Sequence, residues 1–234
     1  GYKKHENALF RLVRTFSGRE QKKEFPVLNS VSFSVQKGEK IGIIGRNGSG
    51  KSTLLRLIGG IYGYDSGSMY VQGTARYISG FSQGLKSKLT MRDNIYLIGS
   101  IMGLTTKEVD EEFDSIVEFS GLEEFVDTKI YQFSSGMVTR LSFSIFIFCI
   151  LRNKPDILLL DEVIGAGGDI DFTKKANAKM VELIGGDSTV LFVSHGLGEI
   201  ERFCSKAIWL EKGNIVAQGD ASVVCNKYKN SVNG

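Results

Sequence analysis

The hydrophobic pattern changes its period several times along the chain. Apolar positions at 31, 33 and 35 alternate with polar ones, which predicts a half-buried strand. A second alternating stretch predicts a short hairpin around Gly73, over Met69–Ile78. Short apolar runs predict buried strands at Ile41–Ile44, Ile157–Leu160, Val190–Val193 and Ala207–Leu210. Helical stretches separate them, at Lys51–Ile58, Phe172–Ile184, Leu197–Phe203 and Ala221–Tyr228.

The middle of the chain has a helical pattern. Two threonine–acid pairs have capping-box spacing and mark helix starts, namely Thr90 with Asp93 and Thr105 with Glu108. Three helices are expected here, over Met91–Met102, Thr106–Phe119 and Gly136–Leu151. We therefore expect an α/β fold in a single domain, 1–234: a mostly parallel sheet with flanking helices, an amino-terminal antiparallel β part, and an inserted α-helical subdomain at 84–152.

Composition places the chain among globular proteins. It has 234 residues, 42% hydrophobic and 24% charged, and its net charge of +3 is too small to indicate nucleic acid as a partner. The cysteines have no metal-ligand spacing, which predicts buried, reduced thiols at Cys149, Cys204 and Cys225. The longest apolar run, Ile145–Leu151, is far shorter than the ~20 residues of a membrane span, and no leader segment is expected.

A glycine-rich segment between a predicted strand and a predicted helix fits G-x-x-x-x-G-K-[ST] in full. Such a loop wraps its backbone N–H groups around phosphates, and the following helix directs its positive end at them. We expect Lys51 to reach the β- and γ-phosphates and Ser52 to hold Mg²⁺. The expected nucleotide-binding residues are Gly45, Asn47, Gly48, Ser49, Gly50, Lys51, Ser52 and Thr53. Together they define a P-loop NTPase.

Acidic and basic side chains follow two other predicted strands. Asp161 and Glu162 end the strand Ile157–Leu160, which is where P-loop NTPases hold magnesium. Asp161 suits a metal ligand, and Glu162 suits a general base that polarises the attacking water. His195 follows Val190–Val193, and because parallel strands end at one edge of the sheet it is expected to reach the γ-phosphate.

The segment Asn153-Lys154-Pro155-Asp156 has the form of the guanine-reading motif of GTPases. It precedes the strand that ends at Asp161 rather than following a later one, and no D-x-x-G follows a strand where a GTPase switch needs it. We therefore interpret it as a turn that ends a helix.

The motifs together resemble the ATPases of ABC transporters over about residues 25–220. Phe133-Ser134-Ser135-Gly136-Met137 resembles their signature loop, and it stands in family order between the P-loop and Asp161-Glu162. The Ser-Ser-Gly-Met and Asp-Glu-Val forms resemble the branch that exports capsular polysaccharide, O-antigen or teichoic acid across the bacterial inner membrane. We expect no further carboxyl-terminal sugar-binding domain, and that expectation favours the capsule-like type.

The resemblance implies an ATP hydrolase that uses ATP and Mg²⁺ and works as a head-to-tail homodimer with ATP between the subunits. Ser134 and Gly136 of one chain would then meet the P-loop of the other. It also implies two copies of a transmembrane permease subunit, a lipid-linked polysaccharide as cargo, no nucleic acid, and a peripheral position on the cytoplasmic face of the inner membrane. The alternatives are an importer, a small-molecule exporter or a soluble non-transport ABC ATPase.

Four further residues are assigned by the resemblance. Gln83 would stand in the glutamine-containing loop as a metal contact, and Asp169 would serve as the aspartate after Glu162, with one glycine inserted. Phe16 or Phe25 would stack on adenine, and either could equally be a core residue.

Overall fold

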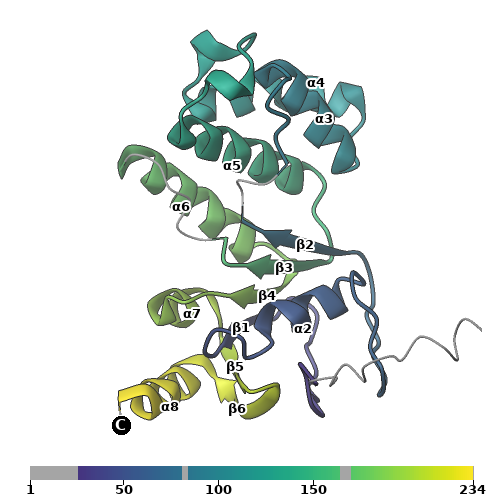
Figure 1. The fold of residues 1–234 in the computed structure, drawn as a ribbon, viewed down its shortest axis with the longest axis vertical. Helices are drawn as coiled ribbons and strands as arrows, with labels where there is room; N and C mark the ends of the chain where they lie inside the picture. Colours follow the sequence, from purple (N-terminus) through teal and green to yellow (C-terminus); the bar gives the residue numbers. More distant parts are fainter. Residues whose placement is uncertain (1–25, 81–83, 164–169, 234) are drawn as a thin grey trace, which may run out of the picture.

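The computed structural model describes residues 26–80, 84–163 and 170–233, and it arranges most of the elements around one sheet (Figure 1). The strands are β1 Lys40–Ile44, β2 Ala75–Ser79, β3 Ile157–Asp161, β4 Thr189–Val193, β5 Lys206–Glu211 and β6 Asn214–Asp220. The α-helices are α2 Lys51–Ile58, α3 Met91–Ile101, α4 Thr106–Ser120, α5 Ser135–Arg152, α6 Ile170–Gly185, α7 Leu197–Phe203 and α8 Ala221–Asn233. Two short 3₁₀ turns join α4 to α5, η1 Glu123–Phe125 and η2 Ile130–Gln132.

The sheet has the strand order β2-β3-β4-β1-β5-β6. Every neighbouring pair is parallel except β5–β6, which is antiparallel. The carboxyl ends of β1, β3 and β4 therefore lie side by side at one edge, where ligands bind in open α/β sheets. The expected α/β fold with a mostly parallel sheet and flanking helices is confirmed.

Helices cover both faces of this sheet, and each face has its own core. The first core lies between the sheet and α2, where Ile43 and Leu55 are fully buried and the partly buried Val31 and Phe33 pack alongside. The second, larger core lies on the opposite face under α6, α7 and α8 and continues into α5. Burial on both faces explains why the central strands are continuous apolar runs rather than alternating ones.

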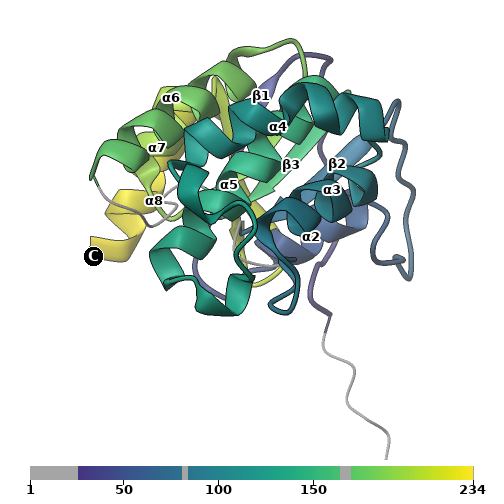
Figure 2. The same ribbon diagram turned by 90° about the horizontal axis from the view of Figure 1, so that it is seen from above.

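The helices α3, α4 and α5 lie together at one end of the molecule (Figures 1 and 2). Both predicted capping boxes are present: Thr90 accepts from Asp93 N–H, Thr105 accepts from Glu108 N–H, and each acid bonds back to its threonine. The helix starts are therefore fixed by local chemistry. That these helices form a subdomain with the limits 84–152 stays a prediction.

Among the described helices, α5 alone is long and apolar enough, by length and composition, to cross a membrane. It packs against α3, α4 and α6, and Leu141, Ile145 and Ile147 are fully buried there. A single helix of this kind is weak evidence for a span, since the core helix of a globular protein has the same composition. The structure uses α5 as a core helix.

Two predicted elements are wrong. Residues 31–36 alternate in burial as expected but form no strand, so the antiparallel pair found in the described chain is β5–β6. Residues 69–74 also form no strand, so there is no hairpin: β2 pairs with β3 instead. Asp156, which precedes β3, accepts hydrogen bonds from Thr74 N–H at 2.8 Å and its hydroxyl at 2.9 Å. This long-range contact fixes the register of β2.

Candidate functional site

The phosphate-binding loop connects β1 to α2 and bends in a way that only glycine tolerates. Gly45 has a φ of +148°, and a Cβ there would lie 2.1 Å from the carbonyl oxygen of Leu210. Gly50, at a φ of +104°, is the N-cap of α2, and its Cβ would lie 2.7 Å from Leu28 Cδ2. The loop is therefore pressed against the chain behind it, while Asn47 and Gly48 remain exposed at its tip.

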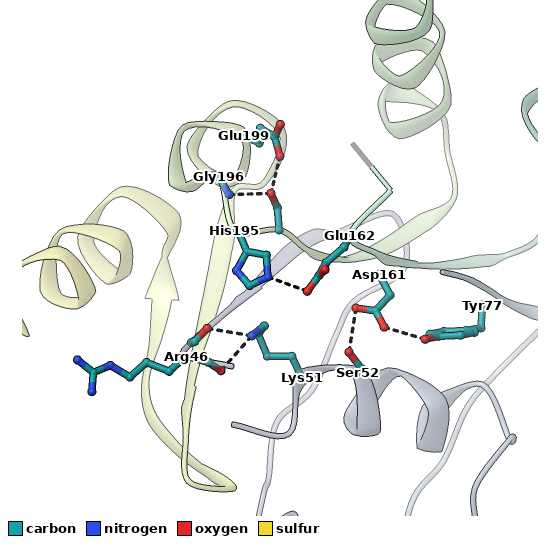
Figure 3. Close-up of polar contacts among 11 residues, drawn as sticks. Arg46, Lys51, Ser52, Tyr77, Asp161, Glu162, His195, Gly196 and Glu199 are labelled. Carbon is teal, nitrogen blue, oxygen red and sulfur yellow. Dashed lines mark hydrogen bonds and ion pairs between the residues drawn. The ribbon is translucent and has the colours of Figure 1, made fainter. Parts of the chain in front are cut away.

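Lys51 is the first residue of α2 and folds back over the loop. Its Nζ donates to the carbonyl oxygens of Gly45 at 2.9 Å and Arg46 at 3.1 Å (Figure 3). Burial lowers the pKa of Lys51, and the nearby carboxylates of Glu162 and Asp161 oppose that shift. Among the described residues the hydrogen bonds of this buried ammonium go to two neutral carbonyl oxygens. An anion such as a phosphate would therefore stabilise it.

Ser52 and Tyr77 hold the Asp161 carboxylate from two different elements. Ser52 Oγ, on α2, donates to Asp161 Oδ1 at 3.1 Å, and Tyr77 OH, on β2, donates to Oδ2 at 2.7 Å (Figure 3). Asp161 is 6% exposed, so its carboxylate cannot rely on water to orient it. Burial raises the pKa of Tyr77, and the bond to Asp161 raises it further, so the phenol remains a donor at neutral pH.

Glu162 and His195 face each other beside Lys51. His195 Nε2 lies 2.8 Å from Glu162 Oε1, and both side chains are about half exposed, at 55% and 51%. Glu162 has a φ of +55°, unusual for a residue with a side chain, and its N–H donates to the carbonyl oxygen of Val193 at 3.0 Å. This bond ties the end of β3 to the end of β4, which brings the two side chains together. Non-glycine residues held in this region concentrate at functional sites.

Two residues near His195 were not anticipated from the sequence. Ser194 is buried, donates its hydroxyl to Glu199 on α7, and accepts a bond from Gly196 N–H at 2.9 Å. The turn that carries His195 is thereby fastened to the first turns of α7. A serine or a glutamate at these positions has no local pattern that would have revealed the contact.

The predicted signature loop lies at the start of α5. Ser134 is the N-cap, and its Oγ accepts a bond from Met137 N–H at 3.2 Å. Ser134 and Ser135 are exposed, and the nearest atom to a Cβ placed on Gly136 is Ser134 Oγ, 3.9 Å away. The turn is formed but open, in contrast to the buried parts of the P-loop.

Some predicted residues lie elsewhere or outside the described part of the chain. Phe16, Phe25, Gln83 and Asp169 lie outside the described residues, and their roles stay predictions. Thr53, on α2, is half-buried beside Ser52. Asn153 is the C-cap of α5, which confirms that the segment before Pro155 ends a helix. Asp156 directly precedes β3, at the amino end of the strand, whereas Asp161 lies at its carboxyl end.

The residues present fit a nucleotide with a divalent cation. Ser49 is 3% exposed, and its buried hydroxyl has no hydrogen-bond partner within the described part of the chain, so the loop retains an unsatisfied polar atom. Ser52 and Asp161 offer a hydroxyl and a carboxylate, the oxygen ligands that Mg²⁺ prefers. The described residues contain no group of three or more His, Cys, Asp or Glu side chains able to hold a metal by themselves. The cation would therefore depend on phosphate oxygens as well.

This combination of fold and site defines a P-loop nucleotide-binding protein. The family model described as "ABC transporter" matches residues 28–165. The chain belongs to the ABC transporter family.

Curated relatives indicate which branch of the family this chain resembles. The O-antigen export system ATP-binding protein RfbB of Klebsiella pneumoniae is 38% identical over 228 residues, covering 97% of this chain and 88% of the relative. The teichoic acids export ATP-binding protein TagH of Bacillus cereus is 39% identical over 228 residues, covering 97% of this chain and 40% of TagH. RfbB of Myxococcus xanthus is 38% identical over 94% of this chain, which spans 50% of that relative. The resemblance to the polysaccharide-export branch is confirmed.

Solved structures agree on the fold. An ATP-binding subunit of an ABC transporter superposes with a TM-score of 0.70 at 23% identity, covering 87% of each chain. A dimeric ATP-binding cassette in a post-hydrolysis state with ADP and phosphate superposes with a TM-score of 0.65 at 22% identity, covering 83% of this chain and 90% of that one.

Proposed function

We propose that this chain is the ATP-binding and ATP-hydrolysing subunit that powers export of a lipid-linked polysaccharide across the bacterial inner membrane through a separate transmembrane subunit. The observation that carries the proposal is the convergence of Lys51, Asp161, Glu162 and His195 at one sheet edge. Support for the cargo comes from the O-antigen and teichoic-acid export names of its relatives.

Nucleotide binding uses the P-loop first. The Lys51 ammonium exchanges its bonds to the carbonyls of Gly45 and Arg46 for the phosphates, with backbone N–H groups at the start of α2 aligned behind it. Ser52 and Asp161 would hold the Mg²⁺. When bound, Mg²⁺ neutralises charge on the phosphate oxygens and lowers the barrier to attack at the γ-phosphorus.

Hydrolysis requires a water that attacks the γ-phosphorus as the bond to the β-phosphate oxygen breaks. Glu162 accepts a proton from that water as general base, and ADP leaves with the bond electrons. His195 carries a donor on Nε2 in its contact with Glu162, and the same donor serves a γ-phosphate oxygen. The strained backbone of Glu162 and the Ser194–Glu199 contact hold the pair at the edge of the sheet.

A second copy of the chain completes the site. The exposed Ser134 and the N–H groups of the first turn of α5 form a surface of hydrogen-bond donors. None of the described contacts of this surface is with the P-loop of the same chain. In a head-to-tail homodimer this surface covers the γ-phosphate on the partner's P-loop. ATP binding closes the dimer and hydrolysis releases it, since the two states bind the partner differently. The permease, present in two copies, contacts the dimer at the cytoplasmic face of the membrane and changes conformation as the dimer closes and opens.

The test of hydrolysis and transport combines one variant with two assays. Purified Glu162→Gln should bind ATP like the wild type and hydrolyse it at a small fraction of the wild-type rate. Introduced in the native host, the same variant should remove the glycan from the surface and accumulate its lipid-linked form inside. The matched control is Glu118→Gln on the exposed surface of α4. Unchanged surface glycan, with the variant expressed and inactive as an ATPase, would contradict polysaccharide export.

A further inference from the structure

A chain of hydrogen bonds runs from the end of α2 to Asp161 and involves two residues outside every motif. Tyr77 OH donates to Asp161 Oδ2 at 2.7 Å, and Arg56 Nε donates to the same phenolic oxygen at 3.1 Å. Arg56 Nη1 also donates to Tyr62 OH at 3.1 Å. The phenol thus accepts from a permanent cation and donates to a carboxylate, which fixes the direction of its O–H bond.

The sequence and the strand register explain why these groups meet. Ser79 is the partner of Asp161 across β2 and β3, and Tyr77 lies two positions earlier on the same face of the sheet. Arg56 follows Ser52 by four residues, so both project from the same side of α2 toward this face. The end of α2 also lies close to this strand, since a Cβ on Gly59 would be 3.4 Å from the Cβ of Tyr77.

The two oxygens of Asp161 are therefore in different situations. Oδ1 faces the Ser52 hydroxyl on the P-loop helix, and Oδ2 is held by Tyr77 on the side away from it. A carboxylate anchored through one oxygen loses its freedom to rotate, so the other oxygen stays directed at the cation site. Such supporting contacts commonly tune metal affinity because they orient the ligand that touches the metal.

We infer that Tyr77, braced by Arg56, is a positioning residue that orients the Asp161 carboxylate for the nucleotide-bound divalent cation. The inference rests on the proposed function, since it needs Asp161 to hold that cation. Tyr77 acts through Asp161 and does not itself contact the nucleotide. Its hydroxyl sets cation affinity while leaving the phosphate-binding loop unchanged.

The test measures Mn²⁺, a spectroscopic substitute for Mg²⁺, on the full chain. Tyr77→Phe removes only the hydroxyl and keeps the ring. The Mn²⁺ dissociation constant of the protein–ATP complex, followed by the paramagnetic resonance signal of free Mn²⁺, should rise roughly 10-fold, the usual loss for a hydrogen bond to a charged group. ATP affinity in the presence of EDTA should be unchanged. Arg56→Met should shift the Mn²⁺ constant in the same direction, by roughly threefold.

The matched control is Tyr96→Phe. Tyr96 OH donates to Asp110 Oδ1 at 2.6 Å between α3 and α4, a bond of the same kind outside the site. This variant should leave both affinities unchanged. Asp161→Asn serves as a benchmark and should weaken Mn²⁺ binding more than Tyr77→Phe does.

Each contrary result has a distinct meaning. If Asp161→Asn leaves Mn²⁺ affinity at the wild-type value, the proposed metal role fails. If Asp161→Asn weakens it but Tyr77→Phe does not, the positioning role of Tyr77 is overturned while the proposed function stands. The inference also falls if Tyr77→Phe lowers ATP affinity in EDTA as much as in Mn²⁺, because the hydroxyl would then support the phosphate loop.

Discussion

Two turns that begin helices carry predicted nucleotide-related motifs, and they differ in how completely the chain surrounds them. At the P-loop, Ser49 and Lys51 are 3% and 5% exposed, and Gly45 leaves no room for a side chain in front of Leu210. At the start of α5, Ser134 and Ser135 are exposed. Both turns begin a helix, yet only the first is enclosed by its own chain.

This difference in enclosure suggests that the two turns contribute to different steps, nucleotide binding and hydrolysis. An enclosed loop is already ordered in the free chain, so nucleotide binding to a single chain loses little conformational entropy. An exposed helix start is fully hydrated and gains from a phosphate only when a second surface removes the water. We therefore expect binding to belong to the first turn and hydrolysis to require both.

The largest effect should follow from Glu162→Gln, which keeps the volume of the side chain and removes the base. General-base catalysis contributes roughly 10²–10⁴-fold to a rate, so single-turnover ATP hydrolysis should fall by that order. Nucleotide affinity should hold, since Glu162 is exposed and outside the loop. A variant that hydrolyses ATP at the wild-type rate would show that another group is the base.

Lys51→Ala should have the next largest effect, on binding itself. A charge-assisted bond to phosphate is worth about 1.5–3 kcal/mol, so ATP affinity measured by titration should fall roughly 10–100-fold. The control is Lys107→Ala, an exposed lysine in the first turn of α4. Equal ATP affinities for Lys51→Ala and the wild type would contradict the assignment of nucleotide binding to the enclosed P-loop.

How far the sequence predicts this site depends on how local each contact is. The P-loop sequence, the capping boxes and the order of Asp161, Glu162 and His195 follow from short-range patterns. The structure confirms the capping boxes and brings Glu162 and His195 into contact. The bond between Asp161 and Tyr77 depends on the pairing of β2 with β3, which the predicted hairpin missed. That pairing is set by Thr74 and Asp156, 82 residues apart, and no local periodicity contains it.

The same reasoning explains the missed strand β6. Its residues alternate between exposed and partly buried positions, but its interior Gly219 and the polar Gln218 weaken the apolar pattern on which sequence prediction depends. Residues 31–36 show the converse case, since their burial alternates although they do not pair with a neighbouring strand. Alternation reports which side faces the core, and strand pairing requires a neighbour as well.

Mixing two impaired variants, at an ATP concentration too low to saturate Lys51→Ala, tests whether the exposed turn acts in trans. Lys51→Ala lacks a working P-loop and Ser134→Ala lacks the hydroxyl at the start of α5. In a head-to-tail heterodimer of the two, one site has both defects and the other has none. An equal mixture should therefore recover about a quarter of wild-type ATPase activity under random pairing. Activity no greater than that of the two variants measured separately would contradict the shared site.

The smallest effect compares two helix caps. Ser134 caps α5 and Thr105 caps α4, each accepting a bond from the backbone N–H three residues later, so replacing either with Ala should lower the free energy of unfolding by about 1 kcal/mol. Urea denaturation should show similar losses for both variants. Only Ser134→Ala should also lower ATP hydrolysis, by roughly 10-fold for a lost bond to a charged phosphate. If Thr105→Ala lowered hydrolysis as much, capping alone would account for both effects, and the start of α5 would have no role beyond holding its helix.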